Sequence, residues 1–441
     1  MDILPYDLST TNDLLTSRSG LICIAEVMKK IGFSEAVDQY FPVPGSNRGY
    51  RPSVFVTPLI LMFQEGGRSL NDLRHIRGDE ALRLLLGMEK FPESDSTGDW
   101  LRRLGQDGVK AVTEVNRLVL QKSLHNCKKV TLDIDATLSE SKNKSAQWTY
   151  KKCKGYMPMV GHIGETGQVV ATEFREGNVA PASNNLQFIR HCEQALPAGV
   201  ALSSVRIDAA GYQAEILDMC INRQLKFAIR AKMSPSLKKE IQSQGKEQWQ
   251  PLLDAQGCPI ENESTLRLVH TMEKSQNAFT LIVQRRLIKG QQEMCLEDPE
   301  NQETFQTGAY LYRAIAVSPD FVLTDSRWVH WYNQRGEHSE NRIKELKTDF
   351  AADRMPCQNF DANALYFALC ALAYNLFALF RMFLPACFES TRAKTIRWRI
   401  FALAGKVVRH GRKLYLKLKQ AHHDLLRNIL QRLSSLSPAA P

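Results

Sequence analysis

The sequence predicts a mixed α/β protein: an α+β mixed sheet flanked by helices, with a helical N-terminal domain and a β-rich insertion. Two observations carry this prediction. Apolar residues follow helical spacing over about the first 125 residues, and near residue 128 the spacing changes to that of strands alternating with helices. The chain has 441 residues, too many for one simple core, so two or three domains are expected.

Residues 1–125 are expected to form the helical N-terminal domain. Helical spacing or dense apolar runs occur at residues 21–31 and 53–63, two short helices are expected at 69–77 and 79–87, and another starts near Asp95. Such a series of short helices fits a helix-turn-helix-like DNA-binding domain and also an ordinary helical bundle, and the sequence does not separate the two.

Residues 126–232 are expected to form the first part of a core built on a mixed sheet flanked by helices. The predicted elements are a strand at 129–135, a hairpin at 161–174, a helix at 184–195, a strand at 205–208, a helix at 213–222 and a strand at 226–230. Residues 233–320 interrupt this rhythm with strands near 266–270, 279–283 and 310–317 and a polar loop at 291–306. This interruption is the predicted β-rich insertion.

The core is expected to resume over residues 321–385, with a strand at 321–325 and then a polar helix. The stretch from Ala362 to Leu379 has no charged residue and approaches the length of a membrane span. It also contains Asn363 and Asn375, which favour a helix buried inside a large domain over a membrane span. No membrane partner is therefore expected.

The last region, residues 386–441, is strongly basic. Residues 391–441 contain twelve Lys and Arg residues and one acidic residue, a local net charge of +11 in a chain of net charge +10. Strands are expected at 397–403, 406–410 and 412–418, followed by a helix at 421–433. The charge favours a polyanion such as nucleic acid as partner, with a solvated basic surface as the alternative.

Cysteine usage and the N-terminus indicate the compartment. The ten cysteines occur singly, without a CxxC pair, which favours buried free thiols over zinc sites or disulfides. The first residues lack the basic and apolar regions of a signal peptide. A cytoplasmic location is expected.

Two aspartates end predicted strands and are candidates for metal ligands. Asp135 and Asp208 follow apolar strand residues, and open α/β sheets place ligands at such strand ends. Asp133 competes with Asp135, because residues two apart on a strand share a face. A carboxylate shared by two Mg²⁺ ions, with one further carboxylate for each ion, is a minimal site for phosphoryl transfer.

The polar helix offers the third carboxylate. Glu340, Lys344 and Lys347 lie on one helical stripe, so Glu340 could face metal ions while the lysines contact DNA phosphate. Tyr332 and Arg335 precede them and are candidate DNA-binding residues as well. A solvated charged helix face is the alternative interpretation, and Glu337 and Glu345 are alternatives to Glu340, Glu345 lying off the stripe.

These residues resemble a known family, the DDE transposases of bacterial insertion sequences with a Tyr-x2-Arg-x3-Glu-x6-Lys signature. Tyr332-x2-Arg335 and Glu340-x6-Lys347 match it, with one extra residue between Arg335 and Glu340, as in one branch of the group. Asp135-Ala-Thr resembles the first family motif and favours Asp135 over Asp133, and Asp208-Ala-Ala-Gly resembles the second.

The resemblance implies an RNase H-like catalytic core with a β-rich insertion, in which Asp135, Asp208 and Glu340 are both catalytic and metal-binding. It implies two Mg²⁺ ions, with Mn²⁺ as an alternative ion, and a homodimer in the synaptic complex. It also implies cleavage at terminal inverted repeats and strand transfer into target DNA. Trp328 and Trp331 are candidates for managing a flipped base, with core packing as the alternative.

Two further functions remain as hypotheses. One is a catalytically inactive, transposase-derived DNA-binding protein, although intact Asp135, Asp208 and Glu340 weigh against it. The other is an RNase H-like nuclease that cleaves DNA without strand transfer. The domain boundaries expected from the resemblance are a DNA-binding domain at 1–125, core at 126–232 and 321–385, insertion at 233–320 and a DNA-binding region at 386–441.

Overall fold

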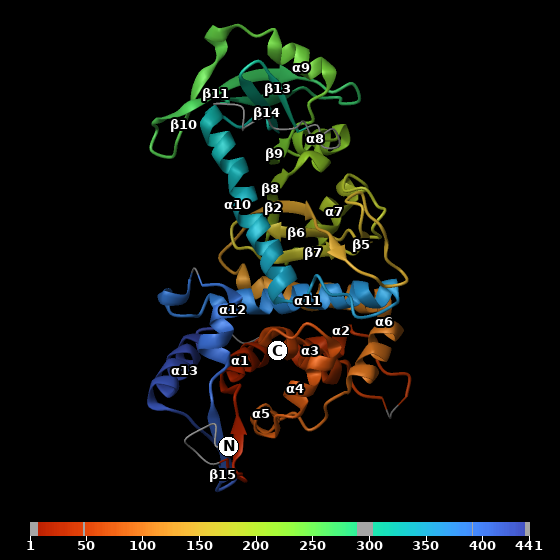
Figure 1. The fold of residues 1–441 in the computed structure, drawn as a ribbon, viewed down its shortest axis with the longest axis vertical. Coiled ribbons are helices and arrows are strands. Elements are labelled where there is room, and N and C mark those ends of the chain that lie inside the picture. The colour runs from red at the N-terminus through yellow and green to blue at the C-terminus, as the bar shows by residue number, and fades with distance from the viewer. Residues whose placement is uncertain (1–7, 47–48, 289–302, 390, 437–441) are drawn as a thin grey trace, which may run out of the picture. The chain divides into compact units, whose positions relative to one another are not determined.

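The computed structural model describes residues 8–46, 49–288, 303–389 and 391–436, and the side chains of residues 337–339 are not described. The chain divides into two compact units (Figure 1). One unit combines Met1–Ser123 with Glu345–Pro441, and the other is Leu124–Lys344. The five domains predicted at 1–125, 126–232, 233–320, 321–385 and 386–441, with their functions, stay predictions.

The second unit is built on a ten-stranded mixed sheet. Its central strands, in spatial order, are β7 (Val169–Glu173), β6 (Met159–Ile163), β2 (Lys129–Ala136), β8 (Ala201–Ile207) and β9 (Lys226–Arg230). Strands β2, β8 and β9 are parallel, whereas β6 and β7 are antiparallel to their neighbours. The predicted strands, hairpin and mixed sheet are confirmed.

The β-rich insertion continues this sheet. Its strands are β10 (Gln250–Leu253), β11 (Pro259–His270), β12 (Phe279–Leu287), β13 (Thr304–Thr307) and β14 (Tyr310–Val317). Strand β14 pairs with β9, so that Ile315 lies opposite Arg230, and β12 and β11 follow outward. Most of the polar loop predicted at 291–306 lies outside the described residues, which resume at residue 303. The end of the predicted loop belongs to β13, which begins at Thr304.

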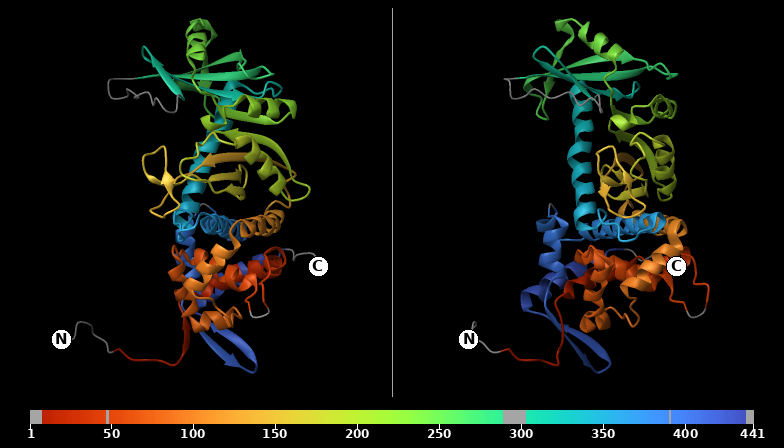
Figure 2. Two further views of the ribbon diagram at one scale, coloured as in Figure 1. Left: turned by 90° about the vertical axis from the view of Figure 1, so that its right-hand side faces the viewer. Right: turned by 45° about the vertical axis from the view of Figure 1, so that its right-hand side comes forward.

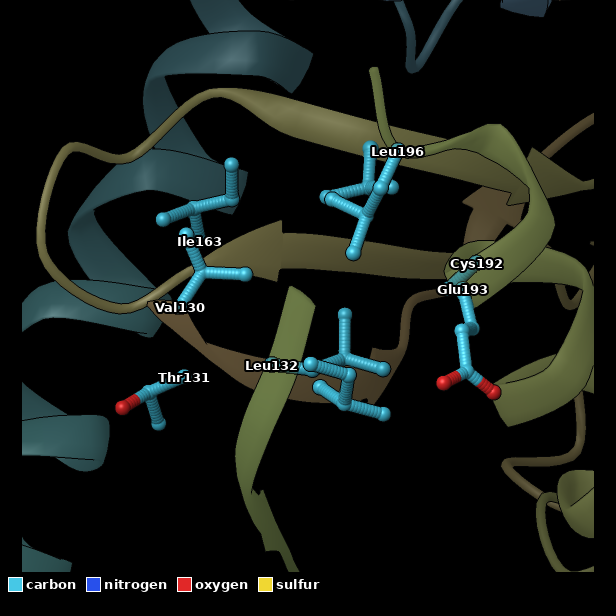
Figure 3. A pocket seen from close by; sticks show the side chains of 9 residues that line it. Val130, Thr131, Leu132, Ile163, Cys192, Glu193 and Leu196 are labelled. Carbon is cyan, nitrogen blue, oxygen red and sulfur yellow. The ribbon is translucent and has the colours of Figure 1, made fainter. Parts of the chain in front are cut away.

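Helices cover both faces of the core sheet (Figure 2). Helices α7 (Asn185–Ala195) and α8 (Ala214–Asn222) lie on one face, and α10 (Asp325–Asp349) crosses the other. Figure 3 shows a narrow apolar pocket on the α7 face, where Val130 and Leu132 of β2 approach Cys192 and Leu196. Because side chains alternate along a strand, Asp133 and Asp135 of β2 point to the opposite, α10 face.

The strand predicted at 321–325 is wrong. Residues Phe321–Thr324 are irregular, and α10 begins at Asp325. Val322 is 99% exposed, and the Thr324 hydroxyl accepts a hydrogen bond from the Arg327 amide in the first turn of the helix (3.4 Å). A side-chain oxygen that satisfies an otherwise unpaired amide favours a helix start over a further strand. Phe321 and Leu323 still pack against the core below α10.

A small sheet leaves the core directly after β2. It contains β3 (Ser139–Glu140), β4 (Gln147–Trp148) and β5 (Lys154–Tyr156), in the spatial order β3-β5-β4. The sequence did not predict it. Strands of two or three residues give too short a pattern for periodicity to detect.

The first unit is mainly helical. Its helices are α1 (Ile22–Lys30), α2 (Phe33–Tyr40), α3 (Pro52–Glu65), α4 (Leu73–Arg77), α5 (Glu80–Leu85), α6 (Ser94–Ser123), α11 (Phe360–Arg381), α12 (Ala393–Ile396) and α13 (Gln420–Leu433). By length and composition α11 could cross a membrane, but 94% of its most apolar window is buried. Its Asn375 amide donates to Asn116 of α6 (2.6 Å). The predicted buried helix is confirmed.

The C-terminal region confirms one predicted hairpin and corrects one strand. Strands β15 (Gly405–His410) and β16 (Lys413–Lys417) form the hairpin, and β1 (Leu14–Thr16) pairs with β15. The strand predicted at 397–403 is wrong, because Arg397–Phe401 form a π-helical turn. Its Arg397 guanidinium donates to the carbonyls of Phe63 and Gln64 near the end of α3, and this tertiary contact outweighs the alternating pattern.

Candidate active site

Asp135 and Asp208 meet at the same end of two neighbouring parallel strands. Ile134 of β2 lies opposite Ile207 of β8, so the two aspartates are the next residues of adjacent strands. Adjacent strands lie about 4.8 Å apart, which places both carboxylates at one sheet end. Asp208 is held in a short turn, where its Oδ1 accepts the Ala210 amide (2.9 Å). The structure therefore brings these two predicted residues together.

Helix α10 contributes a buried cation to this sheet end. Arg335 is 7% exposed, and its Nη2 lies 3.1 Å from Oδ2 of Asp135. The same nitrogen donates to the Ile134 carbonyl (3.0 Å). Burial alone would lower the pKa of Arg335, but the charge of Asp135, with that of Asp208, raises it above its ordinary value. Arg335 is therefore a positioning residue for Asp135 in this structure rather than a residue at the surface.

The pKa of Asp135 depends on the charges of the other two candidate carboxylates. Burial, opposed by the positive charge of Arg335, raises the pKa of Asp135 to about 6. The negative charges of Asp208 and Glu340 add to this rise. Glu340 is thus within electrostatic reach of Asp135. Arg335 contacts the Asp135 carboxylate, and the charges of Asp208 and Glu340 also act on that carboxylate, so a further cation is favoured here.

Glu340 itself is exposed on α10. It lies five positions after Arg335, which is a rotation of about 500° and leaves it about 140° around the helix from Arg335. The extra residue in the signature is the reason for this offset. Within the part of the chain that the structure describes, no three acidic, histidine or cysteine side chains converge closely enough to hold a metal ion.

Asp133, the alternative to Asp135, is fully engaged elsewhere. It is 0% exposed, and its two oxygens accept from Nε and Nη2 of Arg206 (2.7 and 2.8 Å). Arg206 also donates from Nη1 to the Trp331 carbonyl of α10 (2.6 Å). Asp133 therefore ties β2 and β8 to α10, and its pairing leaves Asp135 as the strand aspartate available for chemistry.

Sequence reasoning missed Arg206, His162 and Arg342 around this site. Arg342 donates to the carbonyls of Ile163 and Gly164 (3.0 and 3.1 Å), which fastens α10 to the β6–β7 hairpin. It lies seven residues after Arg335, the spacing of one helix face, so this periodicity could have identified it. His162 lies opposite Asp133 in the sheet and is buried. Burial and the charges of nearby arginines lower the pKa of His162 to about 3.

Acid is expected to destabilise this unit through His162. The folded protein keeps the ring neutral down to about pH 3, whereas the unfolded chain binds a proton below about pH 6.5. The stability that His162 contributes is complete above pH 6.5 and is lost as pH falls towards 3, by up to about 1.4 kcal/mol per pH unit. His162→Gln should flatten the pH dependence of the urea midpoint, and an equally steep loss would contradict this. The exposed His125→Gln is the control.

The other predicted residues occupy different environments. Tyr332 is 7% exposed, with the Arg230 guanidinium 4.7 Å from its ring centre, and Trp328 is 0% exposed in the same core cluster. Core packing is thus the observed role of Trp328, while Trp331 is partly buried against Lys226. Lys344 is exposed and Lys347 is half-buried.

The chain is similar to known proteins in sequence and in fold. The family described as "Transposase DDE domain group 1" matches residues 7–438. The chain belongs to this transposase family. No curated protein matches the sequence. Among solved structures, it is similar to a piggyBac transposase in a cryo-EM synaptic complex with hairpin DNA, at 10% identity and a TM-score of 0.46, covering 98% of this chain and 89% of that one.

A divalent metal ion fits the donors of this transposase. Mg²⁺ prefers hard oxygen ligands and needs few protein carboxylates, and Asp135, Asp208 and Glu340 supply oxygens only. Burial is the main cause of the raised pKa of Asp135, and repulsion from the negative charges of Asp208 and Glu340 adds to it. A bound cation would relieve that repulsion, so the chemistry of the donors fits the ion that DDE transposases generally use.

Of the two alternatives to Glu340, the side chain of Glu337 lies outside the described residues, and Glu345 has a structural role in the transposase. Its Oε1 accepts from Arg381 Nη2 (2.7 Å) and from the Ala393 amide (2.9 Å), and the residue is 8% exposed. We expect Glu345→Gln to destabilise the protein by about 1–3 kcal/mol, because it weakens a buried charged acceptor. Glu340→Gln should leave the melting temperature unchanged and abolish DNA nicking. Calorimetry and a nicking assay on both variants would show the opposite pattern if Glu345 were the catalytic residue.

Proposed function

We propose that the protein is a cut-and-paste transposase of a bacterial insertion sequence, from the Tyr-Arg-Glu-Lys signature group and its branch with one extra residue. It would cleave DNA at terminal inverted repeats and join the freed ends to target DNA. The observation that carries this proposal is the meeting of Asp135 and Asp208 at one sheet end, with the charge of Glu340 acting on Asp135.

The chain's own residues divide the work in this proposal. Asp135, Asp208 and Glu340 would hold two Mg²⁺ ions, or Mn²⁺ in their place. When bound, such ions activate the attacking oxygen and stabilise the leaving oxygen of a phosphodiester. Arg335 holds the Asp135 carboxylate in position through its 3.1 Å contact. The buried Asn185 amide donates to the Ala210 carbonyl (3.1 Å) and steadies the turn that presents Asp208.

The proposed substrate is DNA. In this proposal a homodimer of the protein holds both ends of the element. Exposed Lys344 and half-buried Lys347 on α10, together with the basic hairpin β15–β16, supply positive charge for the phosphate backbone. We place the protein in the bacterial cytoplasm at the nucleoid, because its substrate lies there. These assignments rest on charge and on the family.

A single reaction tests the proposal against its alternatives. The purified protein would be incubated with Mg²⁺, a linear DNA carrying the inverted repeats that flank its gene, and a plasmid target. The proposal expects Mg²⁺-dependent 3′-hydroxyl ends at the repeats and joined products in the plasmid. Cleavage without joining would indicate a nuclease, and binding to the repeats without cleavage would indicate an inactive DNA-binding protein.

A further inference from the structure

The small sheet after β2 carries an unusual surface. We call residues 139–156, which contain β3, β4 and β5, the ribbon. Strands β3 and β4 pair antiparallel with the two sides of β5, so that Glu140 and Gln147 both lie opposite Gly155. The ribbon stands off the side of the core sheet (Figure 2, left, yellow). None of the chemistry described above uses it.

Positive charge concentrates on the ribbon. It contains five lysines and one acidic residue, Glu140, and all five lysines are exposed: Lys142, Lys144, Lys151, Lys152 and Lys154. The local charge is therefore about +4 within 18 residues. A cluster of one sign on a small exposed element is the electrostatic footprint of a polyanion partner.

Two aromatic side chains are exposed among these lysines. Trp148 is 63% exposed and Tyr150 is 46% exposed. Trp148 lies directly opposite Lys154 across the two strands, and the Lys151 ammonium is 5.7 Å from the centre of the Tyr150 ring. Exposed rings beside ammonium groups can stack with bases while the ammonium groups contact phosphates. A base offers its face for such stacking only where it is unpaired.

The ribbon is firmly attached and therefore pre-organised. Tyr156 is 0% exposed, packs against Phe174 with ring centres 4.7 Å apart, and shares a hydrogen bond with Ser145 (2.6 Å). A Cβ atom on Gly155 of β5 would lie 2.4 Å from the Ser139 carbonyl oxygen of β3. The two strands are therefore packed too closely for a larger residue at this position. A surface held in one conformation loses little entropy on binding.

The ribbon also begins close to the candidate active site. Ser139 follows Asp135 by four residues, which span at most about 14 Å. Strand β4 is two strands away from β3, a further distance of about 10 Å. At the rise of about 3.4 Å per nucleotide of a stacked strand, the path from Asp135 to Trp148 would cover at most roughly seven nucleotides. The ribbon is thus within reach of DNA that is being cleaved at Asp135.

We propose that the ribbon binds unpaired DNA next to the cleavage site, with Trp148 and Tyr150 stacking on bases and the lysines contacting phosphates. The position of the bound DNA rests on the proposed function, but the binding itself needs no metal ion and no cleavage. The partner follows from the chemistry of the patch and from the transposase family, whose substrate is DNA.

The test measures binding of the full chain to a labelled 20-nucleotide single strand, and to the same sequence as a duplex, by fluorescence anisotropy in EDTA. Trp148→Ala should weaken single-strand binding about 5- to 100-fold. Trp148→Phe, which keeps a stacking ring, should recover most of that affinity, and duplex binding should change less. Because EDTA prevents cleavage, this result is independent of whether the metal-dependent reaction occurs.

A charge-matched pair of variants tests the lysines. Lys151→Gln/Lys154→Gln should reduce the slope of log affinity against log salt for the single strand by about 1.4, which is about 0.7 for each lost phosphate contact. The control Lys246→Gln/Lys274→Gln removes two exposed lysines from outside the ribbon and should leave the slope unchanged. The proposal is overturned if Trp148→Ala, with an unchanged melting temperature, binds the single strand as tightly as the parent, or if the control pair lowers the slope equally.

Discussion

Replacing Asp208 with asparagine is expected to lower DNA nicking about a thousandfold or more, while binding to the element ends persists. The change removes one negatively charged oxygen ligand, and such ligands support several kcal/mol of charge stabilisation in the transition state. Asparagine keeps an oxygen that can accept the Ala210 amide, so the turn at Asp208 should survive. It also removes a like charge beside Asp135, so the melting temperature should stay level or rise.

Asp254→Asn provides the matched control. Asp254 accepts the amide of the residue two positions later, Gln256, at 2.9 Å, which is the geometry of Asp208 and Ala210. It lies in the insertion, in a turn after β10. A nicking assay with Mg²⁺ and a gel-shift assay on end DNA would compare the two variants. Nicking by Asp208→Asn at the parent's rate would refute the metal-site assignment, as would an equal loss in Asp254→Asn.

Periodicity predicted the parts of the fold that depend on local sequence. Strand β2, the hairpin β6–β7, buried helix α11 and hairpin β15–β16 were all predicted because apolar runs, alternation or turn residues lie within each segment. Asp135 and Asp208 were predicted as partners because each ends such a strand. Their adjacency, Ile134 opposite Ile207, depends on strand order, which a single sequence does not encode in any local pattern.

The errors arose where long-range contacts outweighed local pattern. The π-helical turn at Arg397 depends on carbonyls more than 300 residues earlier in the chain. The continuation of the core sheet through β14 and β9 likewise joins distant segments. In the site, DNA binding by Arg335 stays a prediction. The helix face that contains Trp328 and Arg342 packs on the sheet, and Arg335 is buried with it beside Asp135. Charge pattern alone does not distinguish a buried arginine from an exposed one.

The pair of Arg206 and Asp133 should be the most sensitive point for stability in the second unit. Both side chains are nearly fully buried, at 3% and 0% exposure. Arg206→Met would leave the Asp133 carboxylate buried without its partner and would remove the side-chain donor of the Trp331 carbonyl. We expect a loss of about 3–5 kcal/mol in the free energy of unfolding, measured by urea denaturation. Arg223→Met, which breaks the exposed pair with Glu193, should cost less than about 1 kcal/mol.

The double variant Arg206→Met/Asp133→Leu separates the structural role of Asp133 from a catalytic one. An apolar pair of similar volume can replace a buried ion pair at little cost, so the double variant should recover most of the stability lost in Arg206→Met. If Asp133 only fastens β2 to β8 and α10, the stable double variant should still nick DNA. A double variant that folds normally but does not nick would move the catalytic role from Asp135 to Asp133. Because both aspartates lie on one face of β2, this comparison decides between them where strand spacing does not.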